Sequence, residues 1–163
     1  MGECMAKFKS RSSFNVWARC DSETGYVYDF NIYAGRADDQ DGKTTFGERV
    51  VRNLASTIRG YDVVVAFDRF FTTVNLLDTL PFPALGTCIK NRRNMPEFST
   101  QLKKREDIEY LCNAKGTICC RWLYSKEVIL LSNCHGAQAT NVTRKARNGS
   151  KQIIPCLAAI VFA

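Results

Sequence analysis

At 163 residues the chain is long enough for one domain with a buried core, and it could bury about 70% of its extended surface. Its composition, 45% hydrophobic and 24% charged, is that of a globular protein and argues against wholesale disorder. No apolar run reaches the roughly 18 residues of a membrane-spanning helix and no secretory signal is present, so we expect a nuclear or cytoplasmic protein that is not secreted.

The first third of the chain predicts a β-hairpin followed by a helix. Two β-prone runs, 15–20 and 26–34, are joined by a polar turn at 21–25, which is the pattern of a hairpin. Apolar residues then recur at helical spacing from 47 to 59, so we expect a helix over that range.

Acidic residues before this helix and in its first turn approach the pattern of a calcium-binding loop. The segment 38–42 and Glu48 match several positions of that pattern, but Ala37 stands where the first carboxylate is required. We therefore expect a polar turn here and no calcium site.

The most informative segment runs from Tyr61 to Phe67. It is an almost continuous apolar run rich in β-branched residues, which is typical of a central strand buried on both faces of a sheet. The run ends at Asp68, and we expect Thr72 or Thr73 to cap a following helix that Pro81 terminates.

Asp68 is the candidate catalytic and metal-binding residue. A carboxylate at the C-terminal end of a buried strand is well placed to hold a divalent cation near a substrate. Capping of the following helix is the alternative role for the same side chain, and both roles stay open at this point.

The remaining chain predicts further strands separated by basic segments. A strand at 84–89 completes an order of hairpin, helix, strand, helix and strand, which implies an α/β sheet with an antiparallel edge. Beyond the basic, irregular segment 91–105, short β-prone runs between 108 and 132 predict an antiparallel meander. A second basic linker, 143–151, leads to the apolar segment 153–162.

Positive charge is gathered in four clusters that could neutralise phosphates along a nucleic-acid backbone, and solvated loops are the alternative explanation. The net charge is +7 and the pI about 9.1. The candidate nucleic-acid-binding residues are Lys7, Lys9, Arg11, Lys90, Arg92, Arg93, Lys103, Lys104, Arg105, Arg144, Lys145 and Arg147.

The eight cysteines show no Cys-x2-Cys pair of the kind that structural zinc sites use, so we expect reduced thiols that act as small buried hydrophobic residues. On a strand, Cys119 and Cys120 would face opposite sides. We set aside Cys134 and His135 as a thiol and its base, because sequence neighbours rarely meet in that geometry.

The sequence Asp68-Arg69-Phe70-Phe71-Thr72-Thr73 resembles the signature of piggyBac-type transposases. Other segments resemble that family in the same order. Residues 5–13 resemble its Phe-Lys-Gly-Arg segment, 20–26 resemble its Cys-Asp-Ser-x-Thr-Gly-Tyr hairpin, and 47–51 resemble the start of its first helix. Further along, 86–93 resemble its Gly-Thr-x-x-x-Asn-Arg strand and 128–132 resemble its Val-x-Leu-Leu-Ser strand.

This resemblance implies an α/β fold, an RNase H-like mixed sheet with an inserted small antiparallel β sub-domain. Residues 1–90 would form an incomplete RNase H-like catalytic core, 91–152 the inserted β-rich sub-domain with its basic connectors, and 153–163 a truncated return segment. The family implies DDE-type DNA cleavage and strand transfer with two magnesium ions (Mg2+), DNA as the partner, and a homodimer.

Departures from the family pattern bear on catalysis. Asp68 matches the second catalytic aspartate, whereas Gly2 stands at the position of the first, and the third would lie beyond 153–156, past the last residue. We therefore expect Asp68 to be vestigial, magnesium to bind weakly, DNA cleavage to be absent and DNA binding to be weak. The alternatives are an active nuclease in which Glu3 or a partner chain supplies acids, and a domesticated protein-interaction module.

We predict that limited proteolysis cuts within 91–105 before it cuts the core, because a basic segment interrupted by Pro96 is typical of an exposed connector. Mass spectrometry of the first fragments locates the cut. Resistance of this segment would count against a separable β sub-domain.

Overall fold

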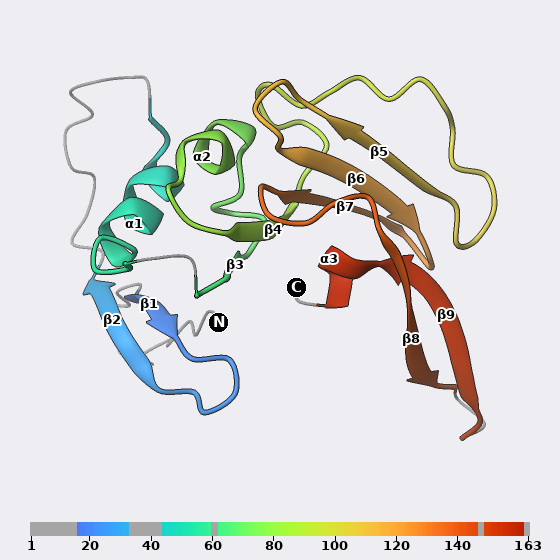
Figure 1. Ribbon diagram of the computed structural model, residues 1–163, viewed down its shortest axis with the longest axis horizontal. Helices are drawn as coiled ribbons and strands as arrows, with labels where there is room; N and C mark the ends of the chain where they lie inside the picture. The colour runs from blue at the N-terminus through green and yellow to red at the C-terminus, as the bar shows by residue number, and fades with distance from the viewer. Residues whose placement is uncertain (1–15, 33–43, 60–61, 147–148, 162–163) are drawn as a thin grey trace, which may run out of the picture.

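Three β-sheets and three short helices make up the part of the chain that the structure describes, in a computed structural model covering residues 16–32, 44–59, 62–146 and 149–161 (Figure 1). In chain order the elements are β1 (Val16–Cys20), β2 (Val27–Ile32), α1 (Phe46–Leu54), β3 (Val65–Phe67), α2 (Val74–Thr79), β4 (Ala84–Cys88), β5 (Ile108–Cys112), β6 (Ile118–Leu123), β7 (Glu127–Ser132), β8 (Ala139–Lys145), β9 (Lys151–Leu157) and α3 (Ala158–Val161). None of the helices in these ranges is long and apolar enough to cross a membrane.

The predicted hairpin is confirmed: β1 and β2 pair as antiparallel strands in a sheet of their own. Its turn is held by Asp21, whose Oδ1 accepts the backbone N–H groups of Glu23 and Thr24, each at 2.9 Å. Gly25 completes the turn with a φ of +71°, a conformation that favours glycine over residues with a Cβ.

The main sheet has the strand order β3-β4-β7-β6-β5, and it is mixed. β3 and β4 run parallel, whereas β4, β7, β6 and β5 pair antiparallel along the rest of the sheet. The pairing of Leu85 with Ser132 joins the meander directly to the strand that follows α2. The α/β class and the mixed sheet are thus confirmed, and the division into 1–90, 91–152 and 153–163 stays a prediction.

The position of the strand before Asp68 corrects one expectation. Only Val65–Phe67 forms a strand, and within the described residues it lies at the end of the main sheet and not at its centre. The apolar run indicated burial correctly, since Val65 and Phe67 face the helices while Ala66 packs toward the opposite face. Packing against helices buries a strand without a second neighbouring strand, and the sequence pattern does not separate the two situations.

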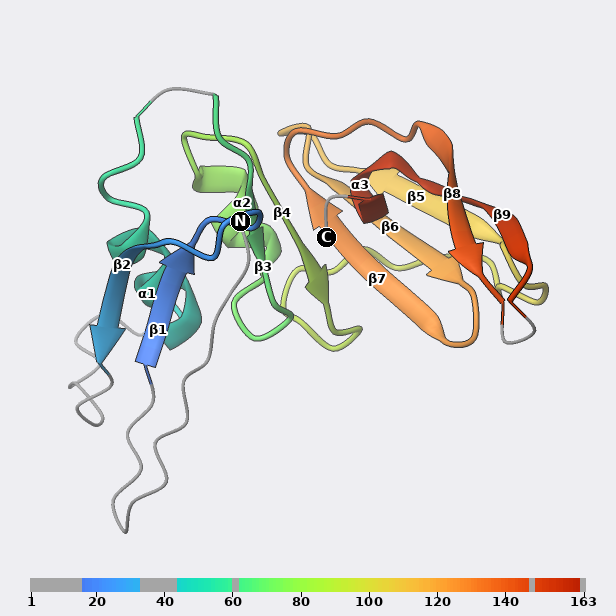
Figure 2. The same ribbon diagram turned by 90° about the horizontal axis from the view of Figure 1, so that it is seen from below.

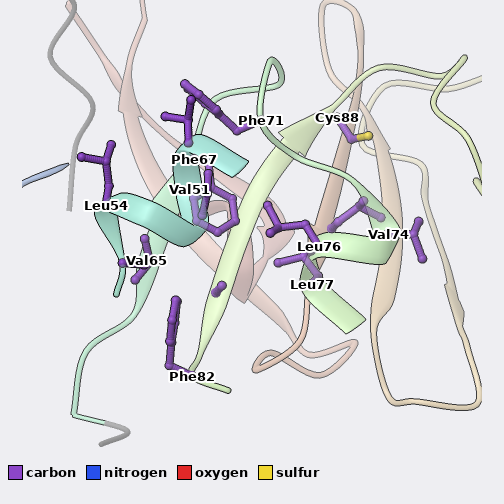
Figure 3. Close-up of a cluster of buried hydrophobic side chains, with 14 of the residues drawn as sticks. Val51, Leu54, Val65, Phe67, Phe71, Val74, Leu76, Leu77, Phe82 and Cys88 are labelled. Atoms are coloured by element: carbon purple, nitrogen blue, oxygen red, sulfur yellow. The ribbon is translucent and has the colours of Figure 1, made fainter. Parts of the chain in front are cut away.

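Hydrophobic side chains cover both faces of the main sheet. On one face the helices α1 and α2 pack their apolar sides against it, with Leu76 and Leu77 at most 1% exposed (Figure 3). On the other face Leu85 and Leu130 pack with Ala159 of α3. The short helix α3 lies against this second face of the sheet (Figure 2).

Two neighbouring cysteines of β6 lie on opposite faces of the main sheet. Cys119 belongs to the first cluster and Cys120 to the second, so these neighbours point to opposite sides of β6, and burial raises the pKa of each thiol to about 12. Cys20, Cys88 and Cys156 are also buried, whereas Cys112 and Cys134 are exposed, contrary to our expectation for these two.

The segment expected as a second basic linker is largely a hairpin. Residues 139–145 and 151–157 pair as β8 and β9, and Gly149 takes a φ of +85° in the turn between them. The sequence did not predict β8 as a strand because its residues are mostly polar and exposed. Val142 is the β8 side chain that packs against the buried cluster of Trp122, Ile154 and Cys156.

Within 91–105 the structure contains no helix or strand, yet one buried cation holds the segment to the sheet. The side chain of Arg121 on β6 donates to the carbonyl oxygen of Thr100 and lies 4.4 Å from the ring centroid of Phe98. It also pairs with Glu109 at 2.5 Å. Hydrogen bonds from the Thr100 hydroxyl and Arg121 lower the pKa of Glu109.

Gly86 lies where β4 crosses the turn that follows β3, and the backbone there has no room for a side chain. A Cβ at this position would lie 2.3 Å from Thr72 Oγ1 and 2.7 Å from the carbonyl oxygen of Phe67. We predict that Gly86→Ala lowers the free energy of unfolding by about 1–3 kcal/mol, because the backbone must shift to admit the methyl group. Urea denaturation measures the effect.

The matched control is Gly136→Ala, where the nearest atom to a new Cβ is Gln138 Cγ at 3.9 Å. This variant should stay within about 0.5 kcal/mol of the unchanged protein. Equal effects of the two substitutions would contradict the close approach at Gly86.

Candidate functional site

Asp68 begins a tight turn directly after β3. Its carbonyl oxygen accepts the backbone N–H groups of Phe71 at 3.0 Å and Thr72 at 3.3 Å, and the Thr72 hydroxyl at 2.9 Å. Among the described residues its carboxylate accepts a single local hydrogen bond, from the backbone N–H of Arg69, and the side chain is exposed. The turn therefore presents the carboxylate to solvent at the end of a buried strand.

The helix after this turn has a different cap. Thr73 is the N-cap residue of α2, and its Oγ1 accepts the backbone N–H of Leu76 at 3.0 Å. The capping role left open for Asp68 is thus wrong, while the cap expected at Thr72 or Thr73 is confirmed at Thr73. The metal-binding role of Asp68 stays a prediction.

Arg92, in the segment that follows β4, fixes the backbone of the Asp68 turn. Its Nη2 donates to the carbonyl oxygens of Arg69 at 2.7 Å and Phe70 at 2.6 Å. The sequence assigned Arg92 to nucleic-acid binding, but this guanidinium is half-buried and bonded to backbone. Its position after β4 makes it a clamp on the turn.

Aromatic rings gather on the other side of the same turn. Phe70 stacks on Trp17 of β1 with ring centroids 5.5 Å apart and an interplanar angle of 11°. Phe71 meets Trp17 edge-on at 5.3 Å, and Phe46 does so at 6.4 Å. The sequence marked Phe70 and Phe71 through the signature motif, whereas Trp17 carried no signal because it is remote along the chain.

Glu48 is a functional-site neighbour whose contacts the sequence did not predict. The helix expected over 47–59 places it correctly, in the first turn of α1, but its carboxylate is buried, with 2% exposed, and is not part of the polar turn with 38–42, a segment outside the described residues. Its carboxylate accepts hydrogen bonds from the Thr73 hydroxyl and from Asn75 Nδ2, the latter at 3.3 Å. The spacing of Thr45 and Glu48, that of a capping box, agrees with this helix start. The partners Thr73 and Asn75 lie 25 and 27 positions away, so no local pattern predicted them.

A hollow of about 790 Å³ opens beside this junction. Glu48, Thr73 and Asn75 line one part of it, and Arg92 and Arg93 line another. No residue of the Asp68 turn lines the hollow, and Arg92 links the two because it lines the hollow and also bonds to the backbone of that turn.

The described residues do not fit a two-metal centre. Across 16–32, 44–59, 62–146 and 149–161 no group of three or more His, Cys, Asp or Glu side chains comes together, and Asp68 has no second carboxylate in its turn. Two bridged ions need several carboxylates around them. Gly2 and Glu3, the other residues relevant to the acid set, lie outside the described ranges.

The structure brings together two of the basic clusters that are separate in sequence. The guanidinium groups of Arg105 and Arg144 lie 3.9 Å and 5.3 Å from the ring centroid of Tyr124. The remaining candidates in the described ranges, Lys90, Arg93, Lys103, Lys104 and Lys145, are exposed. The other candidates, Lys7, Lys9, Arg11 and Arg147, lie outside those ranges.

Cys134 and His135 meet, although we expected that they would not. The tight turn after β7 places Cys134 Sγ 3.2 Å from His135 Nδ1, and Ser132 Oγ lies 3.1 Å from the same nitrogen. The backbone N–H groups of both residues donate to Ser132 Oγ, which draws the pair together. Burial lowers the pKa of His135.

Comparison with known proteins identifies the relatives of this arrangement. The sequence model of a family described as Transposase IS4, of the DDE type, matches residues 3–161. A solved structure, "Cryo-EM structure of piggyBac transposase synaptic complex with hairpin DNA", is similar with a TM-score of 0.67 at 23% identity. The match covers 82% of this chain and 30% of that chain. No curated protein matches.

We predict that Glu48→Ala lowers the free energy of unfolding by about 2–3 kcal/mol, because the Thr73 hydroxyl and the Asn75 amide lose a charged acceptor. Glu48→Gln keeps an acceptor oxygen and should cost less. Urea denaturation at neutral pH measures both.

The control is Glu97→Ala, which removes an exposed carboxylate from the irregular segment 91–105 and should change stability by less than about 0.5 kcal/mol. A Glu48→Ala variant as stable as the Glu97→Ala variant would contradict the junction at Glu48.

Proposed function

Because the chain belongs to the DDE-type Transposase IS4 family, we propose that it is a degenerate transposase core that binds DNA without cutting it. The observation that carries this proposal is the Asp68 carboxylate, exposed at the end of a buried strand in a fold similar to that of a piggyBac transposase. Within the described residues it belongs to no group of three or more side chains that could hold a metal ion. DDE transposases use divalent metal ions, and the chain spans 30% of the length of the solved relative.

The composition of the acid set supports the lack of cleavage. By resemblance, Asp68 occupies the position of one catalytic aspartate, while Gly2 occupies the position of another. A two-metal reaction needs bridging carboxylates that hold the ions about 3.5–4 Å apart, and glycine has no side chain that could take part. We therefore propose that Asp68 is vestigial and that magnesium binds weakly.

Charge supports DNA as the partner. The solved relative is a synaptic complex with hairpin DNA. In this chain the exposed cations Lys103 and Lys104 adjoin Arg105, which shares the ring of Tyr124 with Arg144. Interactions of such cations with phosphates give affinity without sequence preference.

Nuclear localisation and homodimer formation belong to the same proposal. We base the nuclear localisation on the proposed binding of DNA, and the homodimer on the family resemblance. An active nuclease and a protein-interaction module are the competing functions, and cleavage and DNA-binding assays give a different outcome for each.

We predict no cleavage or strand transfer by the purified chain with magnesium or manganese, because one carboxylate does not hold two ions. Nicking of supercoiled plasmid is the assay. Nicking that Asp68→Ala abolishes would overturn the proposal, and Glu3 or a partner chain would then complete the acid set.

We also predict weak binding to duplex DNA that falls steeply as salt rises, measured by fluorescence anisotropy. Replacing Lys103, Lys104 and Arg105 together with Ala should weaken binding to all sequences alike and lower the salt slope by about one for each phosphate that is no longer neutralised. Asp68→Ala should leave binding nearly unchanged.

The control for the triple variant is Lys115→Ala combined with Lys126→Ala, which removes exposed lysines outside the basic clusters and should change binding little. Absence of any salt-dependent DNA binding would favour the protein-interaction module.

A further inference from the structure

The aromatic cluster beside Asp68 presents one ring to solvent. Phe71 is 3% exposed and fills the core, whereas Phe70 is 47% exposed. Trp17 lies parallel to Phe70 with centroids 5.5 Å apart, so it covers one face of that ring. Phe71 meets Phe70 edge-on, with ring centroids 5.0 Å apart. The open part of Phe70 is the surface that neither of these rings covers.

The backbone that carries the Phe70 ring is bonded by Arg92 and lies in close contact with Gly47 of α1. Arg92 donates to the carbonyl oxygens of Arg69 and Phe70, at 2.7 and 2.6 Å. On the other side, Gly47 of α1 approaches so closely that a Cβ there would lie 3.1 Å from the same Phe70 oxygen. A ring held in this way has little conformational freedom to lose on binding, which favours a preformed binding surface.

Positive charge lies on the two segments that meet at this turn, which Arg92 joins through its bonds to the carbonyl oxygens of Arg69 and Phe70. The segments 68–71 and 90–93 carry Arg69, Lys90, Arg92 and Arg93 against the single carboxylate of Asp68. Arg69, Lys90 and Arg93 are exposed. An exposed aromatic face among cations is the combination that single-stranded nucleic acid uses, with phosphates on the cations and bases on the ring.

We propose that the open face of Phe70 stacks on an unpaired DNA base beside Asp68. A base inside a duplex is covered on both faces by its neighbours, so only an unpaired base can offer a face to this ring. The inference rests on the proposed DNA binding and adds to it, because phosphate interactions alone do not distinguish a paired from an unpaired base.

The test compares two end-labelled duplexes of equal length, one fully paired and one with a single bulged 2-aminopurine, by anisotropy at fixed salt. The bulged duplex should bind about tenfold more tightly, within the range found for stacking of one base on an aromatic side chain. The 2-aminopurine fluorescence should fall on binding, because stacking quenches it.

Matched variants separate the aromatic character of the Phe70 side chain from its size. Phe70→Leu keeps an apolar side chain of similar reach and should abolish both the preference and the quenching, while Phe70→Tyr should keep both. Tyr110→Ala removes a ring that is 52% exposed on β5 and should change neither. Thermal unfolding checks that each variant is folded before binding is compared.

Each outcome decides the inference. Equal affinity of the unchanged protein for the two duplexes would overturn the stacking role and leave the proposed DNA binding standing. Retention of the preference by Phe70→Leu would overturn it as well. Failure to bind either duplex would refute the proposed function, and the stacking role with it.

Discussion

The buried carboxylate of Glu48 holds the first turns of α1 and α2 together, and the geometry of the site depends on that junction. The N-terminus of a helix carries partial positive charge, and here two helix starts converge on one anion, which Thr73 and Asn75 bind through hydrogen bonds. Burial of a carboxylate is tolerated because these donors replace water. Since Thr73 both donates to Glu48 and caps α2, the junction determines where the helix begins.

The start of α2 in turn determines the shape of the Asp68 turn. Only a few residues connect β3 to the cap at Thr73, and Gly86 leaves the turn no space on the side of the sheet. Arg92 bonds the same backbone from the end of β4. The Asp68 carboxylate is consequently exposed while the residues around it are held firmly, an arrangement suited to positioning a charge.

Positive charge has two distinct uses in this molecule. Arg92 donates to a carbonyl oxygen of the Asp68 turn and stabilises that turn. Arg121 donates to the carbonyl oxygen of Thr100 and pairs with Glu109, and it stabilises the segment 91–105. Lys103 and Lys104 are exposed, and charge alone qualifies them to bind phosphates. The engagement of Arg92 and Arg121 within the fold removes two of the chain's 23 lysine and arginine residues from those that DNA could use.

The sequence by itself determined the α/β class, the hairpin at β1 and β2, the helix cap before α2 and the opposite orientation of Cys119 and Cys120, because each of these follows from local periodicity or turn chemistry. It also singled out Asp68. Only the tertiary structure decided that β3 ends the main sheet, that Arg92 clamps the turn, and that Glu48 and Trp17 reach the site. These interactions join residues more than 20 positions apart, and their existence depends on how helices pack on the sheet, which no local pattern encodes.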